Sequence, residues 1–225
     1  MAGRWEDAGV VRGFSTAAAN EVLLRFVREE LARRPGLRVL DLGCGAARNA
    51  APMAAAGATV IGTDVAWPML EAGRRRAEGT GVGSRVAFVR APMDHLPLRN
   101  ASVDLVVAHG IWNLARSAAE FRRAVAEAAR VARPGAGLFV FTFSRATLAP
   151  DEQPVPGEPF VFTQFAGEPQ CFLTEEELTG ELLLAGFDKD SPGPLTEYNR
   201  PVPGRTLTHS GPVIYEGMFR AVRRP

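Results

Sequence analysis

The stretch that decides the fold is Val39-Leu40-Asp41-Leu42-Gly43-Cys44-Gly45, an apolar run that ends in an acid and two glycines. Residues 37–42 read as a buried parallel strand, and a helix is expected over residues 46–56, where Pro52 should strain or kink it. A strand that enters a helix through Asp-x-Gly-x-Gly brings backbone close to a ligand, because a Cβ would block that approach. The segment therefore predicts a ligand site at the end of the first strand.

Strand-like and helix-like segments alternate on both sides of this motif. Further strands are expected over residues 59–63, 85–90, 103–108 and 138–143. Helices are expected over residues 16–33, 68–78 and 117–132, and Ser15 or Thr16 is the expected N-cap of the first. This alternation predicts an α/β, Rossmann-like, mostly parallel sheet with helices on both faces.

The chain is expected to form a single domain over residues 1–225, with a helical cap at residues 1–35. Residues 144–173 combine prolines with clustered phenylalanines and predict an ordered insertion that covers the substrate. A last helix over residues 174–185 begins with a sequence resembling a capping box, and a final strand is expected over residues 213–222.

Composition limits the partners of the protein. The 26 basic and 25 acidic side chains give a net charge of +1, so we expect no nucleic-acid partner. We expect no signal peptide, because the first residues are charged, and no apolar run is long enough to span a membrane. Its two cysteines match no metal motif, so we expect no metal and a cytoplasmic location. The oligomeric state, monomer or dimer, is left open.

The residues around the glycine motif narrow the choice of ligand. Asp64 ends the second strand, where an acid can accept both hydroxyls of a ribose. A dinucleotide motif would have a third glycine where this chain has Arg48. Asp41 lies two residues before Gly43, which is awkward near a phosphate but suits an ammonium group. S-adenosylmethionine combines a ribose with an amino-acid end and no phosphate, whereas a purely structural glycine turn is the alternative.

Longer segments resemble class I S-adenosylmethionine-dependent methyltransferases of type 11/25 over nearly the whole chain. The segments that carry this resemblance are VLDLGCGAARN, VIGTDVAWPML, MDHLPLRNASVDLVVAHGIWNL, EAARVARPGAGLFVFTF and FLTEEELTGELLLAGF. The family implies a seven-stranded sheet whose last strand is antiparallel, S-adenosyl-L-methionine as cofactor and S-adenosyl-L-homocysteine as product. DLGCGAARN and TQFAGEPQCFLTEEEL are also loosely similar to tellurite-resistance-type methyltransferases.

The resemblance implies a set of cofactor-binding residues. The glycines approach the methionine end, Asp64 holds the ribose, and Met69 packs either against the adenine or in the core. The full set is Asp41, Gly43, Cys44, Gly45, Asp64, Val65, Met69, Met93, Asp94 and His109. The chain departs from the family at Ala47, where a glycine is usual, and at Pro92, where an acid is usual. Met93 could then contact the adenine through its backbone, with Asp94 as the substitute acid.

The acceptor side is read from the residues after the fourth strand. His109 is either a catalytic proton acceptor or a hydrogen-bonded wall residue, and Trp112 is either a substrate wall or a hydrophobic plug. Asn113 is a further substrate candidate, and Arg48 either pairs with the cofactor carboxylate or forms a salt bridge within the protein. We expect a small-molecule methyl acceptor. The alternatives are a non-catalytic S-adenosylmethionine-binding protein and an NAD(P)-dependent oxidoreductase.

Overall fold

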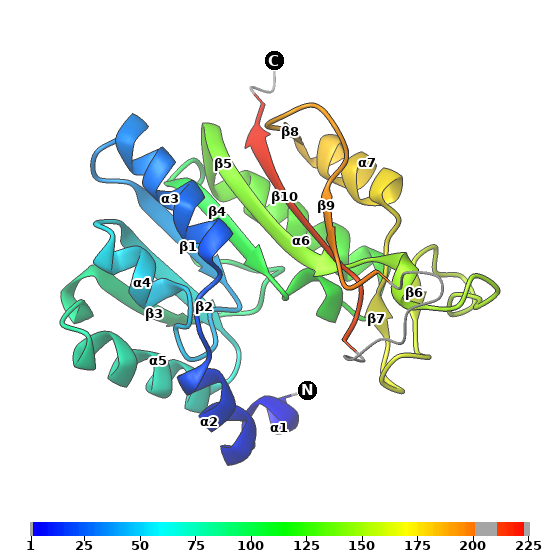
Figure 1. The fold of residues 1–225 in the computed structure, drawn as a ribbon, viewed down its shortest axis with the longest axis horizontal. Helices are drawn as coiled ribbons and strands as arrows, with labels where there is room; N and C mark the ends of the chain where they lie inside the picture. The colour runs from blue at the N-terminus through cyan, green and yellow to red at the C-terminus, as the bar shows by residue number, and fades with distance from the viewer. Residues whose placement is uncertain (1, 201–210, 223–225) are drawn as a thin grey trace.

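The computed structural model describes residues 2–200 and 211–222, and its centre is one mixed sheet (Figure 1). The strands of the main path lie in the order β3-β2-β1-β4-β5-β10-β8, and β9 also pairs with β10. The strands are β1 (Arg38–Leu42), β2 (Thr59–Asp64), β3 (Val86–Arg90), β4 (Val103–His109), β5 (Ala132–Phe143), β8 (Phe187–Lys189), β9 (Thr196–Tyr198) and β10 (Ile214–Ala221). Strands β1 to β5 are parallel, whereas β10 is antiparallel to β5 and β8. The Rossmann-like sheet and its antiparallel last strand are confirmed, and β9 is an addition.

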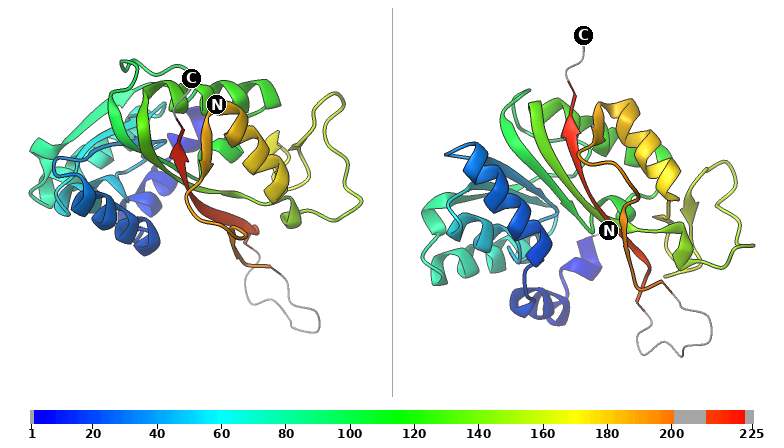
Figure 2. Two further views of the ribbon diagram at one scale, coloured as in Figure 1. Left: turned by 90° about the horizontal axis from the view of Figure 1, so that it is seen from above. Right: turned by 45° about the horizontal axis from the view of Figure 1, so that its top comes forward.

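Helices cover both faces of the sheet, with α3, α4 and α5 on one side and α6 and α7 on the other (Figures 1 and 2). The helices are α1 (Ala2–Trp5), α2 (Ala8–Thr16), α3 (Glu21–Arg33), α4 (Ala50–Ala55), α5 (Trp67–Gly79), α6 (Ala118–Val131) and α7 (Glu175–Ala185). Short 3-10 turns are η1 (Gly83–Arg85), η2 (Trp112–Leu114) and η3 (Arg145–Thr147). Neighbouring residues of β4 point to opposite cores, since Val107 packs with α3 and α4 and Val106 packs with α6.

The helix expected over residues 16–33 begins only at Glu21, as α3, and Thr16 is the last residue of the separate helix α2, so its predicted start was wrong. Ser15 and Thr16 end α2, and their hydroxyls donate back to carbonyls one turn earlier. Asn20 is the N-cap of α3 because its Oδ1 accepts the N–H of Leu23 at 2.9 Å. Apolar periodicity identified the buried face of α3 but could not locate a cap four residues later.

Pro52 does not kink the helix that follows the glycine motif. Residues 46–49 form turns and α4 begins at Ala50, so Pro52 lies in the first turn. An N–H in that turn has no intrahelical partner in any helix, so its absence costs little.

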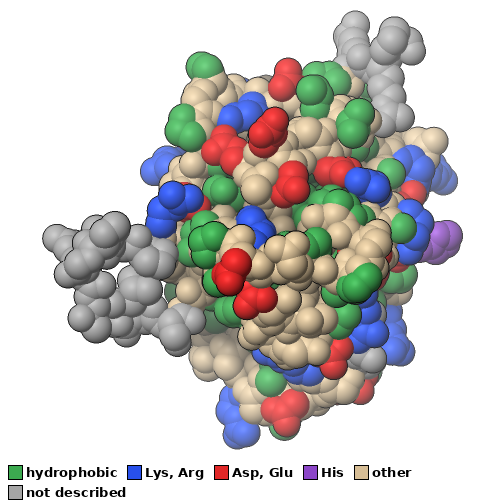
Figure 3. All heavy atoms as spheres, turned by 90° about the vertical axis from the view of Figure 1, so that its right-hand side faces the viewer, with side chains coloured by type: hydrophobic (Ala, Val, Ile, Leu, Met, Phe, Trp, Pro, Cys, Tyr) green, Lys and Arg blue, Asp and Glu red, His purple; other side chains and the backbone are tan. Residues whose placement is uncertain are grey.

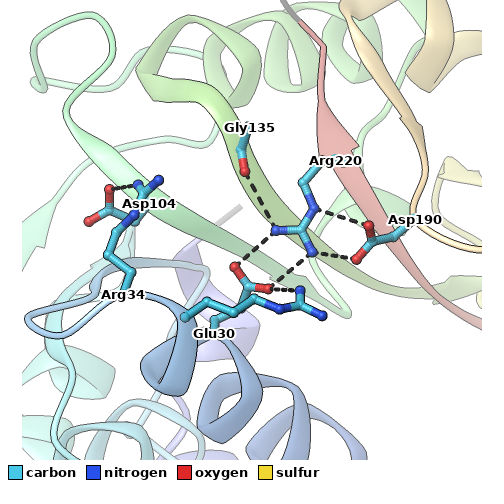
Figure 4. A network of polar contacts seen from close by, with 7 residues as sticks. Glu30, Arg34, Asp104, Gly135, Asp190 and Arg220 are labelled. Carbon is cyan, nitrogen blue, oxygen red and sulfur yellow. Dashed lines mark hydrogen bonds and ion pairs between the residues drawn. The ribbon is translucent and has the colours of Figure 1, made fainter.

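A network of charges ties α3 to the far edge of the sheet (Figure 4). Arg220 on β10 donates to both oxygens of Glu30 on α3, at 2.9 and 3.0 Å, and also pairs with Asp190. Asp104 on β4 pairs with Arg34 and with Arg133, the latter at 2.6 Å. These contacts lie near the amino end of β4 and therefore leave its carboxyl end for a site.

Residues 144–173, the expected insertion, contain a small hairpin of β6 (Val161–Phe162) and β7 (Gln170–Cys171). Phe160 packs edge-on against Phe121 of α6, with ring centroids 5.4 Å apart. The thiol of Cys171 donates to the carbonyl of Ala115 at 3.4 Å. The insertion is therefore fastened beside α6 and η2.

Candidate functional site

The carboxyl ends of β1, β2 and β4 surround a cavity of about 300 Å³. Parallel strands that end at one edge bring their following loops together, and this edge is where open α/β sheets bind ligands. The cavity is lined by Trp5, Phe14, Gly43, Gly45, Asp64, Val65, Met69, Arg90, Ala91, Pro92, Met93, His109, Gly110, Ile111, Leu114 and Glu120. Its size lies at the lower end of the range for small-ligand pockets.

The turn after β1 needs glycine at two positions that face this cavity. Gly43 has φ +62° and Gly45 has φ +51°, in the left-handed region. A Cβ on Gly43 would lie 2.6 Å from Cδ1 of Ile111, which leaves no room for a side chain. Ala47 also has a positive φ of 58° and is fully buried, so the family glycine is replaced at a position that still requires the left-handed conformation.

Asp64 joins the end of β2 to the glycine turn. Its Oδ2 accepts the N–H of Gly45 at 3.0 Å and its Oδ1 accepts the N–H of Ala66 at 2.9 Å. Burial raises the pKa of this carboxyl, and the backbone hydrogen bonds act in the opposite direction. The carboxylate is thus held rigidly in the cavity wall, where its remaining lone pairs can accept hydroxyl groups.

Asp41 is a buried acid without a full set of partners. Its side chain is 1% exposed, and its Oδ2 has no hydrogen-bond partner among the described residues. Burial raises the pKa of Asp41 to about 7; Arg48 opposes this rise and Asp64 adds to it. Native proteins rarely leave such an oxygen unsatisfied, so Asp41 fits a ligand that brings a donor or a positive charge.

His109 lies at the end of β4 between two donors. Nη2 of Arg48 is 3.0 Å from its Nδ1, and Nδ2 of Asn20 is 3.3 Å from its Nε2. Burial, followed by the charge of Arg48, lowers the pKa of His109 to about 4. The ring stacks on Phe141 of β5 with centroids 4.2 Å apart, so its position is fixed on two sides.

A buried carboxylate continues this polar chain towards β9 and β10. Glu216 is 3% exposed, and its Oε2 accepts from Nδ2 of Asn20 at 2.8 Å. Its Oε1 accepts from the hydroxyl of Tyr198 at 2.7 Å, and this contact contributes, after burial, to raising the pKa of Tyr198 to about 12. Segments far apart in the sequence are therefore joined through Asn20 to His109, which lines the cavity.

The N-terminal helices form one wall of the cavity. Trp5 and Phe14 line it and pack edge-on with ring centroids 5.8 Å apart. The side chain of Arg76 on α5 donates to the carbonyls of Ser15 at 3.1 Å and Ala17 at 3.0 Å, and so holds the end of α2 in place.

The structure brings together seven of the residues expected at the cofactor. Gly43, Gly45, Asp64, Val65, Met69, Met93 and His109 line the cavity. Asp41 and Cys44 are buried beside it; the thiol of Cys44 packs under the sheet, 2.7 Å from the Cβ position of Gly62, and burial raises its pKa.

Three expected residues lie elsewhere. Asp94 turns to Arg123 of α6, at 3.2 Å, and does not line the cavity. Trp112 and Asn113 belong to η2 itself, are 0% and 2% exposed, and are not among the residues that line the cavity. No residue of the insertion over residues 144–173 lines this cavity.

Several lining residues were missing from the sequence prediction. Trp5 and Phe14 come from the N-terminal segment, and Ile111, Leu114 and Glu120 follow β4. Trp5 and Phe14 are aromatic residues in a charged N-terminal segment, and this pattern could have indicated that the segment packs against another part of the protein. Glu120 had no signal, because an acid in the first turn of a helix is ordinary.

Comparison with known proteins agrees with this geometry. A family model described as a methyltransferase domain matches residues 39–135. The chain is 38% identical over 110 residues to a demethylmenaquinone methyltransferase of Clavibacter sepedonicus, which covers 48% of this chain and 42% of that protein. It is 31% identical over 195 residues to the ubiquinone/menaquinone biosynthesis C-methyltransferase UbiE of Acidiphilium cryptum (strain JF-5), which covers 79% of this chain and 74% of that protein.

A solved structure shares the fold. The 1,6-didemethyltoxoflavin-N1-methyltransferase of Burkholderia thailandensis, with bound 1,6-didemethyltoxoflavin and S-adenosylhomocysteine, matches with a TM-score of 0.63 and 21% identity. The match covers 89% of this chain and 78% of that one. The chain belongs to the class I S-adenosylmethionine-dependent methyltransferases. The matched part spans less than half of the Clavibacter protein, so the acceptor does not follow from the match.

Proposed function

We propose that this protein transfers a methyl group from S-adenosylmethionine to a small organic acceptor and forms S-adenosylhomocysteine. The observation that carries the proposal is the unsatisfied buried carboxylate of Asp41, beside a cavity walled by Asp64 and two left-handed glycines. The named relatives are methyltransferases of quinone biosynthesis, and the structural neighbour is an N-methyltransferase of a small heterocycle. Both support an acceptor of modest size.

Residues that line the cavity, together with Asp41 and Arg48 beside the glycine turn, fit the parts of the cofactor in order. Asp41 would accept its ammonium group and Arg48 would pair with its carboxylate, while Gly43 and Gly45 allow the backbone to approach the methionine end. Asp64 would accept the ribose hydroxyls, and Met69 would pack against the adenine. When bound, the cofactor supplies an electrophilic methyl group on a positively charged sulfur.

The protein contributes mainly alignment to such a displacement, because the leaving group is already good. The stacked pair of His109 and Phe141 forms a flat wall at the end of β4 and β5. We place the acceptor against this wall, with the insertion over residues 144–173 as an outer cover and Trp112 as a plug beneath it. The N-terminal helices would close the opposite side.

His109 serves in this proposal as a wall that orients its neighbours. An arginine only donates, so the contact with Arg48 occupies the lone pair of Nδ1. The other ring nitrogen, Nε2, faces Nδ2 of Asn20. The Oδ1 of the same amide accepts the N–H of Leu23 at the start of α3. A pKa near 4 also leaves His109 a weak base at neutral pH.

The proposal includes no nucleic-acid partner. Acidic and basic side chains are interspersed on the face drawn in Figure 3, and the net charge is +1. Among the described residues, no helix has both the length and the apolar character that crossing a membrane requires. Both cysteines are unpaired and buried, which supports a reducing, cytoplasmic location.

The test combines binding with product formation. Calorimetry should show that S-adenosylhomocysteine binds and that NAD(P) does not, since the turn lacks the third glycine and has Asp41 behind it. A screen for S-adenosylhomocysteine release with thiols, phenols, amines, selenite and tellurite should then find an acceptor. Tight cofactor binding without product from any acceptor would favour a non-catalytic binding protein.

A further inference from the structure

An acid from α6 reaches the cofactor cavity from an unexpected direction. Glu120 lies in the first turn of α6 and lines the same cavity as Asp64 and Met93. Most of the lining residues that fall between Asp64 and Glu120 in the sequence are apolar. Glu120 therefore adds a second carboxylate to the wall, far along the chain from the glycine turn.

The loop after β3 lacks an acid at this part of the wall. Pro92 has neither a polar side chain nor an N–H, and it lines the cavity between Ala91 and Met93. The nearest carboxylate of the loop belongs to Asp94, which pairs with Arg123 at 3.2 Å. A ligand amino group at this wall therefore finds no carboxylate on the loop.

The carboxylate of Glu120 is held in a defined position. Its Oε2 accepts the N–H of Arg116 at 2.8 Å, and its own N–H donates to Oγ of the N-cap Ser117 at 3.1 Å. No described residue is a hydrogen-bond partner of Oε1. A carboxylate is an acceptor only, so a ligand group facing Glu120 must be a donor.

The backbone of the facing loop offers the complementary group. No described residue accepts the N–H of Met93, which lies in the cavity wall. One acceptor and one donor in the wall of the same cavity match the amino group and the adjacent ring nitrogen of adenine. The same acceptor and donor do not complement a purine that has an oxygen in place of the amino group.

We propose that Glu120 accepts a hydrogen bond from the exocyclic amino group of the adenine and selects adenine over 6-oxopurines. This inference rests on the proposed function, because it takes the adenosyl cofactor as the ligand of the cavity. A site built to bind a donor rejects an analogue that presents an acceptor, since two acceptors then face each other.

The experiment compares two ligands that differ only at the purine. Calorimetry gives the Kd of S-adenosylhomocysteine and of S-inosylhomocysteine, its deaminated analogue, for the wild type and for Glu120→Gln. The wild type should prefer the adenine ligand by at least about tenfold. In Glu120→Gln the preference should shrink to about threefold or less, because the amide can present either its oxygen or its N–H.

The controls separate this inference from folding and from the proposed function. Glu120→Gln keeps an oxygen for the N–H of Arg116, and thermal melting should show an intact fold. Asp94→Asn, on the neighbouring loop but outside the cavity, should keep the full preference. The double variant Glu120→Gln/Pro92→Asp places an acid on the loop and should recover part of the preference for the adenine ligand.

An unchanged preference in Glu120→Gln, or a preference that is lost in Asp94→Asn instead, would overturn the assignment of Glu120 while the proposed function stands. If the wild type binds neither ligand, the proposed function fails and this inference fails with it.

Discussion

The guanidinium of Arg48 lies 3.0 Å from Nδ1 of His109, and burial together with this charge lowers the pKa of His109 to about 4. Arg48 follows the glycine turn, whereas His109 ends β4 and lines the cavity, so the contact joins the segment after β1 to the end of β4. Burial is the larger cause that disfavours the protonated ring, and the positive charge of Arg48 acts in the same direction. Under the proposed function, the pair would link the methionine end of the cofactor to the wall on the acceptor side.

Replacing Arg48 by glutamine should raise the pKa of His109. The pKa of about 4 should move upwards, because a cation beside the ring is lost, but should stay below 6.5, because burial is the larger cause. Titration of the histidine ring protons by NMR measures the change. Arg4→Gln, which alters an arginine of the N-terminal helices, should leave the pKa where it was. A pKa unchanged or lowered in Arg48→Gln would contradict the electrostatic role of the pair.

Asp41 and His109 should give the stability of the protein opposite dependences on pH. The folded pKa of Asp41 is about 7 against an ordinary 3.8, so the folded state binds more protons and stability falls as pH rises across this window. The folded pKa of His109 is about 4 against 6.5, so the unfolded state binds more protons and stability rises with pH there. Between about pH 4 and 6.5 the two contributions oppose each other.

Asp41→Asn should remove the fall of stability with rising pH that the carboxyl of Asp41 causes. Relative to the wild type, its free energy of unfolding should rise with pH between 4 and 7, by up to about 4 kcal/mol at about 1.4 kcal/mol per pKa unit. Urea titrations at several pH values measure this difference, and His109→Gln should change the slope in the opposite direction. Parallel curves for wild type and Asp41→Asn would show that the acid titrates normally.

The residues of the site that could be predicted are those that lie at, or directly after, the end of a strand. Gly43, Gly45 and Asp64 sit directly where strands end, and a strand end is legible from the apolar run before it. Even so, the sequence did not reveal that Asp64 also holds the N–H of Gly45, which depends on how two loops pack.

The part that could not be predicted depends on packing between distant segments. Trp5 and Phe14 reach the cavity because the short helices α1 and α2 fold back over it. The apolar periodicity of residues 1–35 does not indicate where these helices pack. Asp94 was the natural substitute acid by position in the loop, yet Arg123 attracts it outwards and Glu120 lines the wall in its place. Long-range ion pairs of this kind leave no periodic pattern in the sequence.

Alanine at Gly43 should destabilise the protein through two separable causes. The positive φ costs about 1–2 kcal/mol for a residue with a Cβ, and the overlap with Ile111 adds to this. Ile111→Ala removes the two nearest atoms, so the cost of Gly43→Ala should be smaller in that background by about 1 kcal/mol or more. Chemical denaturation of the four proteins of the cycle tests this. Additive effects would mean that the side chain of Ile111 moves away without cost.

Asp64→Ala should weaken cofactor binding by well over tenfold, since the ribose loses its acceptor and the glycine turn loses the contact to Gly45. Calorimetric titration with S-adenosylhomocysteine measures the loss. Asp151→Ala removes an exposed acid of the insertion and should bind as the wild type does. Unchanged affinity in folded Asp64→Ala would remove this residue from the site.

Arg76 should control how well the N-terminal helices cover the cofactor. Its side chain accounts for the hydrogen bonds that hold the carbonyl end of α2 against α5, including those to Ser15 and Ala17. Arg76→Leu should therefore release α1 and α2 and expose Trp5 and Phe14, with a several-fold loss of affinity for S-adenosylhomocysteine and little change in the melting temperature.

Limited proteolysis should then cut Arg76→Leu early, within the first 20 residues, and added cofactor should slow the cut only in part. Arg74→Leu is the matched control, because Arg74 lies two residues away on α5 and its one ion pair within residues 2–200 and 211–222 is with the exposed Glu78, at 3.2 Å. If both variants resist protease equally and bind the cofactor as the wild type does, apolar packing of Phe14 on Met69 and Ala72 is enough to hold the cover. Early cutting of Arg76→Leu alone would show that a few carbonyl contacts decide whether this wall of the cavity stays closed.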